Sequence, residues 1–205
     1  MHIFVLFSVL GLLIPSSAVA EPSLSWLKAP TAPKKASTGE EVVFSGVVEA
    51  INADDKKRIY SLLSQSLDLK MVDGKLIDGC DEEARLEVTA RDLNGDGVPE
   101  IEVAVLGQCF GGMTGFSTYL YIKPGGGQYE ENLGWPGGFE LSKVQNRGFP
   151  DLISVGRGFC RGIHRWRGQR YMHLCNFETG PGGCSGVGLQ CGLDVRVDVP
   201  IDTPH

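Results

Sequence analysis

Three carboxylates and one amide lie within nine positions, from Asp92 to Glu100, in RDLNGDGVPEIEV, the stretch from Arg91 to Val103. Counted from Asp92, side-chain oxygens fall at positions one, three, five and nine, and a glycine stands at position six. A hard cation such as Ca²⁺ takes about six to eight oxygen ligands, and a glycine at six allows the bend that turns alternate side chains inward. With the carbonyl of position seven, the stretch predicts one calcium site whose ligands are Asp92, Asn94, Asp96, Val98 (main chain) and Glu100.

The alternative is a polar turn, because N-G and D-G are strong turn signals. A turn needs neither three carboxylates nor this spacing, and the repulsion between the carboxylates favours a cation. Position twelve is Val103 where a helix-loop-helix calcium site has Glu. Alternating apolar residues on both sides predict flanking strands, so we expect a structural ion between two strands.

The run DLNGDGVPEI resembles the calcium loop of FG-GAP and VCBS-type repeats, in which the loop joins two strands of a blade. The resemblance covers Arg91 to about Leu106 and implies the same five ligands and a small exported bacterial protein. Glu100 departs from the Asp of the family at position nine.

A second constellation is the basic stretch RGFCRGIHRWRGQRY, from Arg157 to Tyr171. On a strand, Arg165 and Arg167 share one face, and His164 and Trp166 share the other. One hypothesis is a surface for a protein or an anionic envelope glycan, formed by Arg161, Arg165, Arg167 and Trp166. The alternative, which we favour, is a solvated strand with Trp166 in the core and its arginines balancing nearby acids.

Nothing in the chain carries a recognised catalytic motif of the nucleophile-elbow, zinc-helix or P-loop kind. A hydrolase using the acids near Trp135, namely Glu130, Glu131 and Glu140, is the alternative to a non-catalytic protein. The formal net charge of −6 disfavours nucleic-acid binding.

The first twenty residues predict a secretory signal that is cleaved before Glu21, because an apolar run precedes Ala18-Val19-Ala20. We expect a periplasmic or secreted protein with no membrane span in the mature form. All six cysteines follow this segment, which predicts disulfides; zinc is disfavoured because the chain has no C-x-x-C pair.

After the signal, residues 21–41 predict a flexible lead and residues 42–205 a single domain. That domain opens with a possible strand at 42–48 and a helix at 54–67, where Asn52 and Asp55 predict a capping box. Period-two alternation then predicts short strands, and a loop rich in Cys and Gly follows from Asn176.

An internal repeat relates Gly97-Val98-Pro99-Glu100-Ile101 to Gly148-Phe149-Pro150-Asp151-Leu152. It predicts related sheet units at about 84–132 and 139–175. The positions that match the acidic loop are Lys143, Gln145 and Arg147, so we expect only the loop fold to persist there, without an ion. The equivalence of Cys109 and Cys160 predicts their disulfide; the remaining pairs predicted are Cys184–Cys191 and Cys80–Cys175.

These patterns predict a mainly β fold: a small twisted β-sandwich or partial propeller of two related sheet units with one N-terminal helix, closed by disulfides. The function expected is that of an exported, non-catalytic, calcium-stabilised binding module, such as a periplasmic inhibitor or immunity-type protein. The alternatives are the periplasmic hydrolase and a structural envelope component.

Overall fold

The computed structural model describes residues 38–46 and 51–192. The chain divides into two units, 1–34 and 35–205, and every described residue belongs to the second. The predicted signal and its cleavage site therefore lie outside the described residues. Within 38–46 and 51–192, no helix is long and apolar enough to cross a membrane.

The main helix, α2 (Ala53–Leu67), begins one residue before the predicted start. Its N-cap is Asn52, whose Oδ1 accepts a hydrogen bond from the Asp55 amide at 2.9 Å. This satisfies a donor that the first helical turn leaves unpaired. The helix buries Ile59, Leu63 and Leu67, which recur on one face.

The first sheet is an antiparallel meander in which each strand pairs with the next one in the chain. Its strands are β3 (Arg85–Arg91), β4 (Glu100–Leu106), β5 (Phe116–Ile122) and β6 (Glu130–Pro136). Ile101, Val103 and Val105 alternate along β4 and are almost fully buried. The period-two pattern of the sequence therefore predicted this sheet and its buried face.

The second sheet repeats the same meander. Its strands are β7 (Gly138–Asn146), β8 (Phe149–Val155), β9 (Cys160–Trp166) and β10 (Tyr171–Glu178). The predicted fold class, mainly β with two related sheet units, is confirmed.

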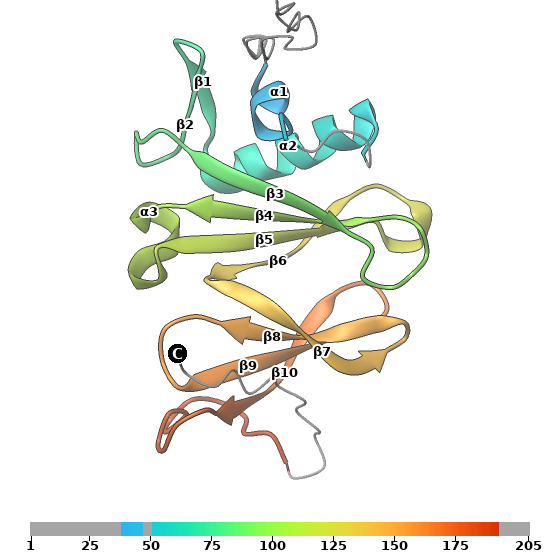
Figure 1. Cartoon of the computed structure of the whole chain (residues 1–205), viewed down its shortest axis with the longest axis vertical. Coiled ribbons are helices and arrows are strands. Elements are labelled where there is room, and N and C mark those ends of the chain that lie inside the picture. The colour runs from blue at the N-terminus through green and yellow to red at the C-terminus, as the bar shows by residue number, and fades with distance from the viewer. Residues whose placement is uncertain (1–37, 47–50, 193–205) are drawn as a thin grey trace, which may run out of the picture. The chain divides into compact units, whose positions relative to one another are not determined.

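The two faces of the first sheet pack against different layers of the molecule, as Figure 1 shows. One core joins α2 to the face of the first sheet that carries Ile101, Val103 and Tyr121. A second core lies between the two sheets and includes Leu120 and Ile122 of β5, Leu152 of β8 and Trp166 of β9. The helix thus covers the first sheet on one side, and the second sheet packs on its other side.

Two hydrogen bonds mark the repeat in three dimensions. Tyr129 donates its hydroxyl to the carbonyl of Pro99 at 2.6 Å, and Tyr171 donates to the carbonyl of Pro150 at 2.8 Å. The residue after each proline is a buried acid in the second strand of its unit: Glu100 begins β4, and Asp151 is the third residue of β8.

The start of the domain differs from expectation. Residues 39–43 form the short helix α1 (Gly39–Val43), so the strand predicted at 42–48 and the lead predicted to reach residue 41 are both wrong here. Thr38 and Glu41 form a capping box, which stabilises a helix where Val42 and Val43 alone suggested a strand. Three further elements were not predicted: the hairpin β1 (Lys70–Val72) and β2 (Lys75–Ile77), and the short helix α3 (Gln108–Gly111).

All six cysteines form disulfides, but the predicted pairing is wrong: the bonds are Cys80–Cys109, Cys160–Cys184 and Cys175–Cys191. The repeat matched Cys109 to Cys160, but Cys109 lies in the short helix α3 and Cys160 is the first residue of β9, so the two places are not equivalent. Cys109 bonds to Cys80 in the turn before β3, and Cys160 bonds to Cys184 in the loop after β10. The last two bonds hold the loop after β10, which returns beside β10 through a bridge between Asn176 and Gln190.

Candidate metal centre

The acidic loop connects β3 to β4 and spans residues 92–99. Asp92 accepts hydrogen bonds from the amides of Gly95 (2.7 Å) and Gly97 (2.9 Å). Gly95 and Gly97 have φ values of 77° and 85°, which explains the glycines at these positions. The bond from the Gly97 amide is the main cause that lowers the pKa of Asp92. The loop is therefore wrapped around the Asp92 carboxylate.

Asn94 and Asp96 continue this pattern. Asn94 Oδ1 accepts from the Asp96 amide at 2.9 Å, and Asp96 Oδ1 accepts from the Val98 amide at 2.7 Å. Asn94 Nδ2 also donates to Asp96 Oδ2 at 2.9 Å. Each of these oxygens has a second lone pair, so the set keeps the oxygen donors that Ca²⁺ prefers.

Glu100, the first residue of β4, hydrogen-bonds back to the start of the loop. Its side chain is 3% exposed, and its Oε2 accepts from the Leu93 amide at 2.7 Å. Burial, opposed by that bond and reinforced by the charges of Asp96 and Asp92, raises the pKa of Glu100 to about 7. Among the described residues, no basic group lies within ion-pair distance of Glu100.

The carboxylates of Asp92, Asp96 and Glu100 do not converge on one point in this structure. In the described parts of the chain, one group of three Asp, Glu, His or Cys residues brings its ligand atoms within 4.8 Å of one another: Asp78, Cys80 and Cys109. Asp92, Asp96 and Glu100 are therefore more widely spaced, and an ion would have to draw them inward. Their chemistry fits a hard cation, because every donor in the predicted set is an oxygen.

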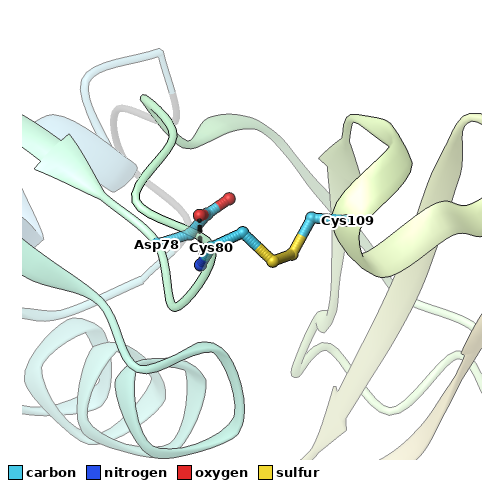
Figure 2. Close-up of side chains that lie close together, drawn as sticks. All are labelled: Asp78, Cys80 and Cys109. Carbon is cyan, nitrogen blue, oxygen red and sulfur yellow. Dashed lines mark hydrogen bonds between the residues drawn. A yellow bond between two sulfur atoms is a disulfide. The ribbon is translucent and has the colours of Figure 1, made fainter.

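The group formed by Asp78, Cys80 and Cys109 is not a metal site in this state, as Figure 2 shows. The two sulfurs are bonded to each other. Asp78 Oδ1 accepts from the amides of Cys80 (2.9 Å) and Glu82 (3.2 Å), which explains its burial at 6% exposed. Asp78 thus orders the turn that carries the disulfide.

The equivalent connection in the second unit has a different fold. Lys143 and Gln145 lie within β7, and only Arg147 and Gly148 connect β7 to β8. Both have positive φ, 53° and 87°, as a two-residue hairpin of this type requires. The expectation that the loop fold would persist here is wrong, because the register bulge in β7 absorbs the extra residues.

The basic stretch on β9 follows the favoured alternative. Trp166 is 4% exposed and stacks on Phe149 with ring centroids 4.2 Å apart, so it is a core residue and not part of a partner surface. Arg165 pairs with Asp151 at 2.6 Å, and Arg161 pairs with Glu140 at 3.4 Å. Of the four residues of that hypothesis, Arg167 alone is exposed.

The acids near Trp135 are held in separate places. Glu131 accepts a hydrogen bond from Ser66 of α2 at 2.7 Å, whereas Glu140 pairs with Arg161 in the second sheet. Glu130 is exposed. The structure does not bring any two of these acids together with a shared partner, as a catalytic carboxylate pair would require.

Two groups at the loop were not predicted, the Leu93 amide and the Tyr129 hydroxyl. The repeated Tyr of the two units was the available signal for the second; the first depends on loop geometry alone. In comparisons with known proteins, the chain matches no family model, no curated protein and no solved structure, so the resemblance to FG-GAP and VCBS-type repeats rests on the residues of this loop.

Proposed function

We propose that this protein is a calcium-stabilised, non-catalytic binding module that acts after export, in the periplasm or outside the cell. The ligands of the ion are Asp92, Asn94, Asp96, the Val98 carbonyl and Glu100. The ion fixes the connection between β3 and β4, so its role is structural.

One observation carries the calcium proposal: within residues 38–46 and 51–192, the buried carboxylate of Glu100 has no basic side chain as a partner, whereas its counterpart in the second unit has one. Asp151 occupies the equivalent place in the second unit, is 2% exposed, and pairs with Arg165. Extending the strand registers by one residue places Ile122 opposite Glu100, where the second unit has Arg165. A buried carboxylate is unfavourable unless it is paired or neutralised, and an external cation supplies what the first unit lacks.

Export is supported by the three disulfides, which are consistent with an oxidising compartment, and by the Ala18-Val19-Ala20 pattern. A protein partner is favoured over an anionic glycan, because Trp166 is buried and Arg161 and Arg165 already have acidic partners. An inhibitor or immunity-type role is the best fit by analogy with small disulfide-bonded exported proteins.

Thermal unfolding with and without calcium tests the ion. Binding to the folded state alone stabilises by about 2.7 kcal/mol at a free concentration one hundred times the dissociation constant. The melting temperature is expected to rise in millimolar CaCl₂ and fall in chelator, with a smaller response to MgCl₂ because Mg²⁺ gives up its water reluctantly.

Asp96→Asn is expected to remove most of the calcium response. The calcium-free variant should be at least as stable as the calcium-free parent, because one repelling charge is gone. Asp73→Asn is the matched control: it removes an exposed Asp from the turn between β1 and β2 and should leave the response intact. A parent whose melting ignores calcium and chelator alike would assign the loop to the polar-turn alternative.

A further inference from the structure

Two histidines face each other across β9 and β10. His164 and His173 are register partners, and their ring centroids lie 5.5 Å apart with the planes at 70°. Side chains at directly opposed positions have Cβ atoms about 4.5–5.5 Å apart and point to the same side of the sheet. The sheet therefore presents two imidazoles to one region.

A β-bulge brings Asn176 to the same region. The register skips Leu174 between His173 and Cys175, so that Asn176 pairs with Gly162. In a regular strand, residues 173 and 176 would point to opposite faces, and the bulge reverses this. Asn176 Oδ1 lies 2.9 Å from His173 Nε2, and the Asn176 residue is 8% exposed.

Gly162 keeps the space between these side chains open. A Cβ atom at Gly162 would lie 3.4 Å from Asn176 Oδ1, from His164 Nε2 and from His173 Cδ2. Two possible ligand atoms, Asn176 Oδ1 and His164 Nε2, and the ring carbon bonded to His173 Nε2 thus converge above a residue that has no side chain of its own.

His164 is held ready as a neutral ligand. Its ring stacks on Trp135 with the planes 3° apart, and Trp135 is itself anchored by a 2.9 Å bond from Nε1 to the Gly138 carbonyl. Burial, with a smaller contribution from His173, lowers the pKa of His164 to about 4. Its Nδ1 is buried without a partner in the described structure, and Nε2 faces Asn176 and His173.

We propose that this cluster binds one transition-metal ion of the Zn²⁺ or Cu²⁺ class through His164 Nε2, His173 Nε2 and Asn176 Oδ1, with water completing the coordination. The ion replaces the hydrogen that lies between His173 Nε2 and Asn176 Oδ1, and that proton moves to His173 Nδ1. Imidazole donors favour Zn²⁺ and Cu²⁺ over Ca²⁺ and Mg²⁺. The site is therefore separate from the acidic loop in position and in chemistry.

Isothermal titration of the untagged exported chain with ZnCl₂, in excess CaCl₂, tests the proposal. His205 is changed to Ala in every protein, so that the chain terminus adds no imidazole. One Zn²⁺ per chain is expected. Removing a direct ligand should weaken binding at least as much as the roughly tenfold to hundredfold loss seen for outer-shell partners. His173→Ala, at an exposed position, is the variant for this loss.

Gly162→Ala provides a second variant that keeps both histidines. Its methyl group would occupy the shared space at ordinary contact distance, and it should also weaken Zn²⁺ binding at least about tenfold. The control is Met172→Ala, which changes an exposed neighbour of His173 on the opposite face and should bind like the parent. Absence of Zn²⁺ binding by the parent, or equal binding by parent and His173→Ala, would overturn the proposal.

Discussion

The two sheet units share one frame, the four-stranded meander with its Tyr–Pro hydrogen bond, and differ in the surroundings of one buried acid. Both are four-stranded meanders, and both have a Tyr hydroxyl bonded to a Pro carbonyl at the start of the second strand. In the second unit Asp151 is neutralised by Arg165, and a two-residue turn suffices between β7 and β8. In the first unit Glu100 has no basic partner among the described residues, and residues 92–99 add two more carboxylates above it.

This difference shows how long the connection between the first two strands of a meander must be to reverse the chain. The turn at Arg147 and Gly148 shows that two residues can close this corner. The extra length and acidity of residues 92–99 therefore have another cause than chain reversal. The comparison also assigns the Tyr–Pro bond to the frame, since it is present in both units whatever the charge beside it.

The largest effect is expected from Arg165→Ala, which leaves the buried acid of the second unit without a basic partner, as in the first unit, but does not add an acidic loop. Asp151 would remain buried without its partner, and breaking such a pair costs about 3 to 5 kcal/mol. Urea unfolding with intact disulfides measures the loss. The double variant Asp151→Asn, Arg165→Met should recover most of it, because no buried charge remains. A loss below about 1 kcal/mol in Arg165→Ala would contradict the equivalence of the two acids.

The next effect is the pH dependence of the calcium-free protein. The pKa of Glu100 is raised from its ordinary value of 4.5 to about 7 in the folded state. The stability contributed by the protonated form is therefore complete below about pH 4.5 and is lost as the pH rises through about 7, a change of about 3 kcal/mol. Glu100→Gln should lack this loss and should be the more stable protein at pH 8 without calcium.

Two measurements control the pH experiment. Calcium should restore stability to the parent at pH 8 and have little effect on Glu100→Gln, because the ion takes the place of the proton. His164 acts in the opposite sense, since its lowered pKa removes stability as the pH falls toward about 4. The comparison is therefore made on the difference between the parent and Glu100→Gln, from which the His164 contribution cancels. Parallel pH profiles would show that Glu100 is not the group responsible.

The smallest effect tests the shared frame. Tyr129→Phe and Tyr171→Phe each remove one hydroxyl and its hydrogen bond to a proline carbonyl, which costs about 1 to 2 kcal/mol. The two losses should be similar in calcium-free protein. Only Tyr129→Phe should also reduce the calcium response, because Pro99 adjoins Glu100 and the loop. An equal reduction in both variants would show that the loop does not depend on its own unit.

Strand positions were predictable because alternation reports burial directly: Ile101, Val103 and Val105 face one core as their spacing indicates. The repeat also predicted two sheet units. The helix α1 had a signal that was not used, the Thr38-x-x-Glu41 capping box. The hairpin between β1 and β2 had one as well, in Asp73-Gly74, whose φ values are 49° and 77°.

The cysteine pairing could not be predicted, because it depends on segments outside the regular strands: Cys109 is in α3, and Cys184 and Cys191 are in the loop after β10. The repeat matches Cys109 to Cys160, but Cys109 lies in the short helix α3 and Cys160 begins β9, so the predicted equivalence is wrong. At the candidate metal centre, the spacing of Asp92, Asn94 and Asp96 was visible in the sequence. The burial of Glu100 was not, because it depends on the face of β4 that the second sheet covers.

The crossed arrangement of the last two disulfides has a consequence for survival among proteases. Cys160–Cys184 and Cys175–Cys191 overlap in the chain, so every peptide bond between Cys175 and Cys191 is spanned by at least one of them. A protease that cuts this exposed loop once opens the backbone without detaching either piece. Such a nicked molecule would run as one band on a non-reducing gel and as two after reduction. The protein can therefore lose the continuity of its chain here and still keep both parts together.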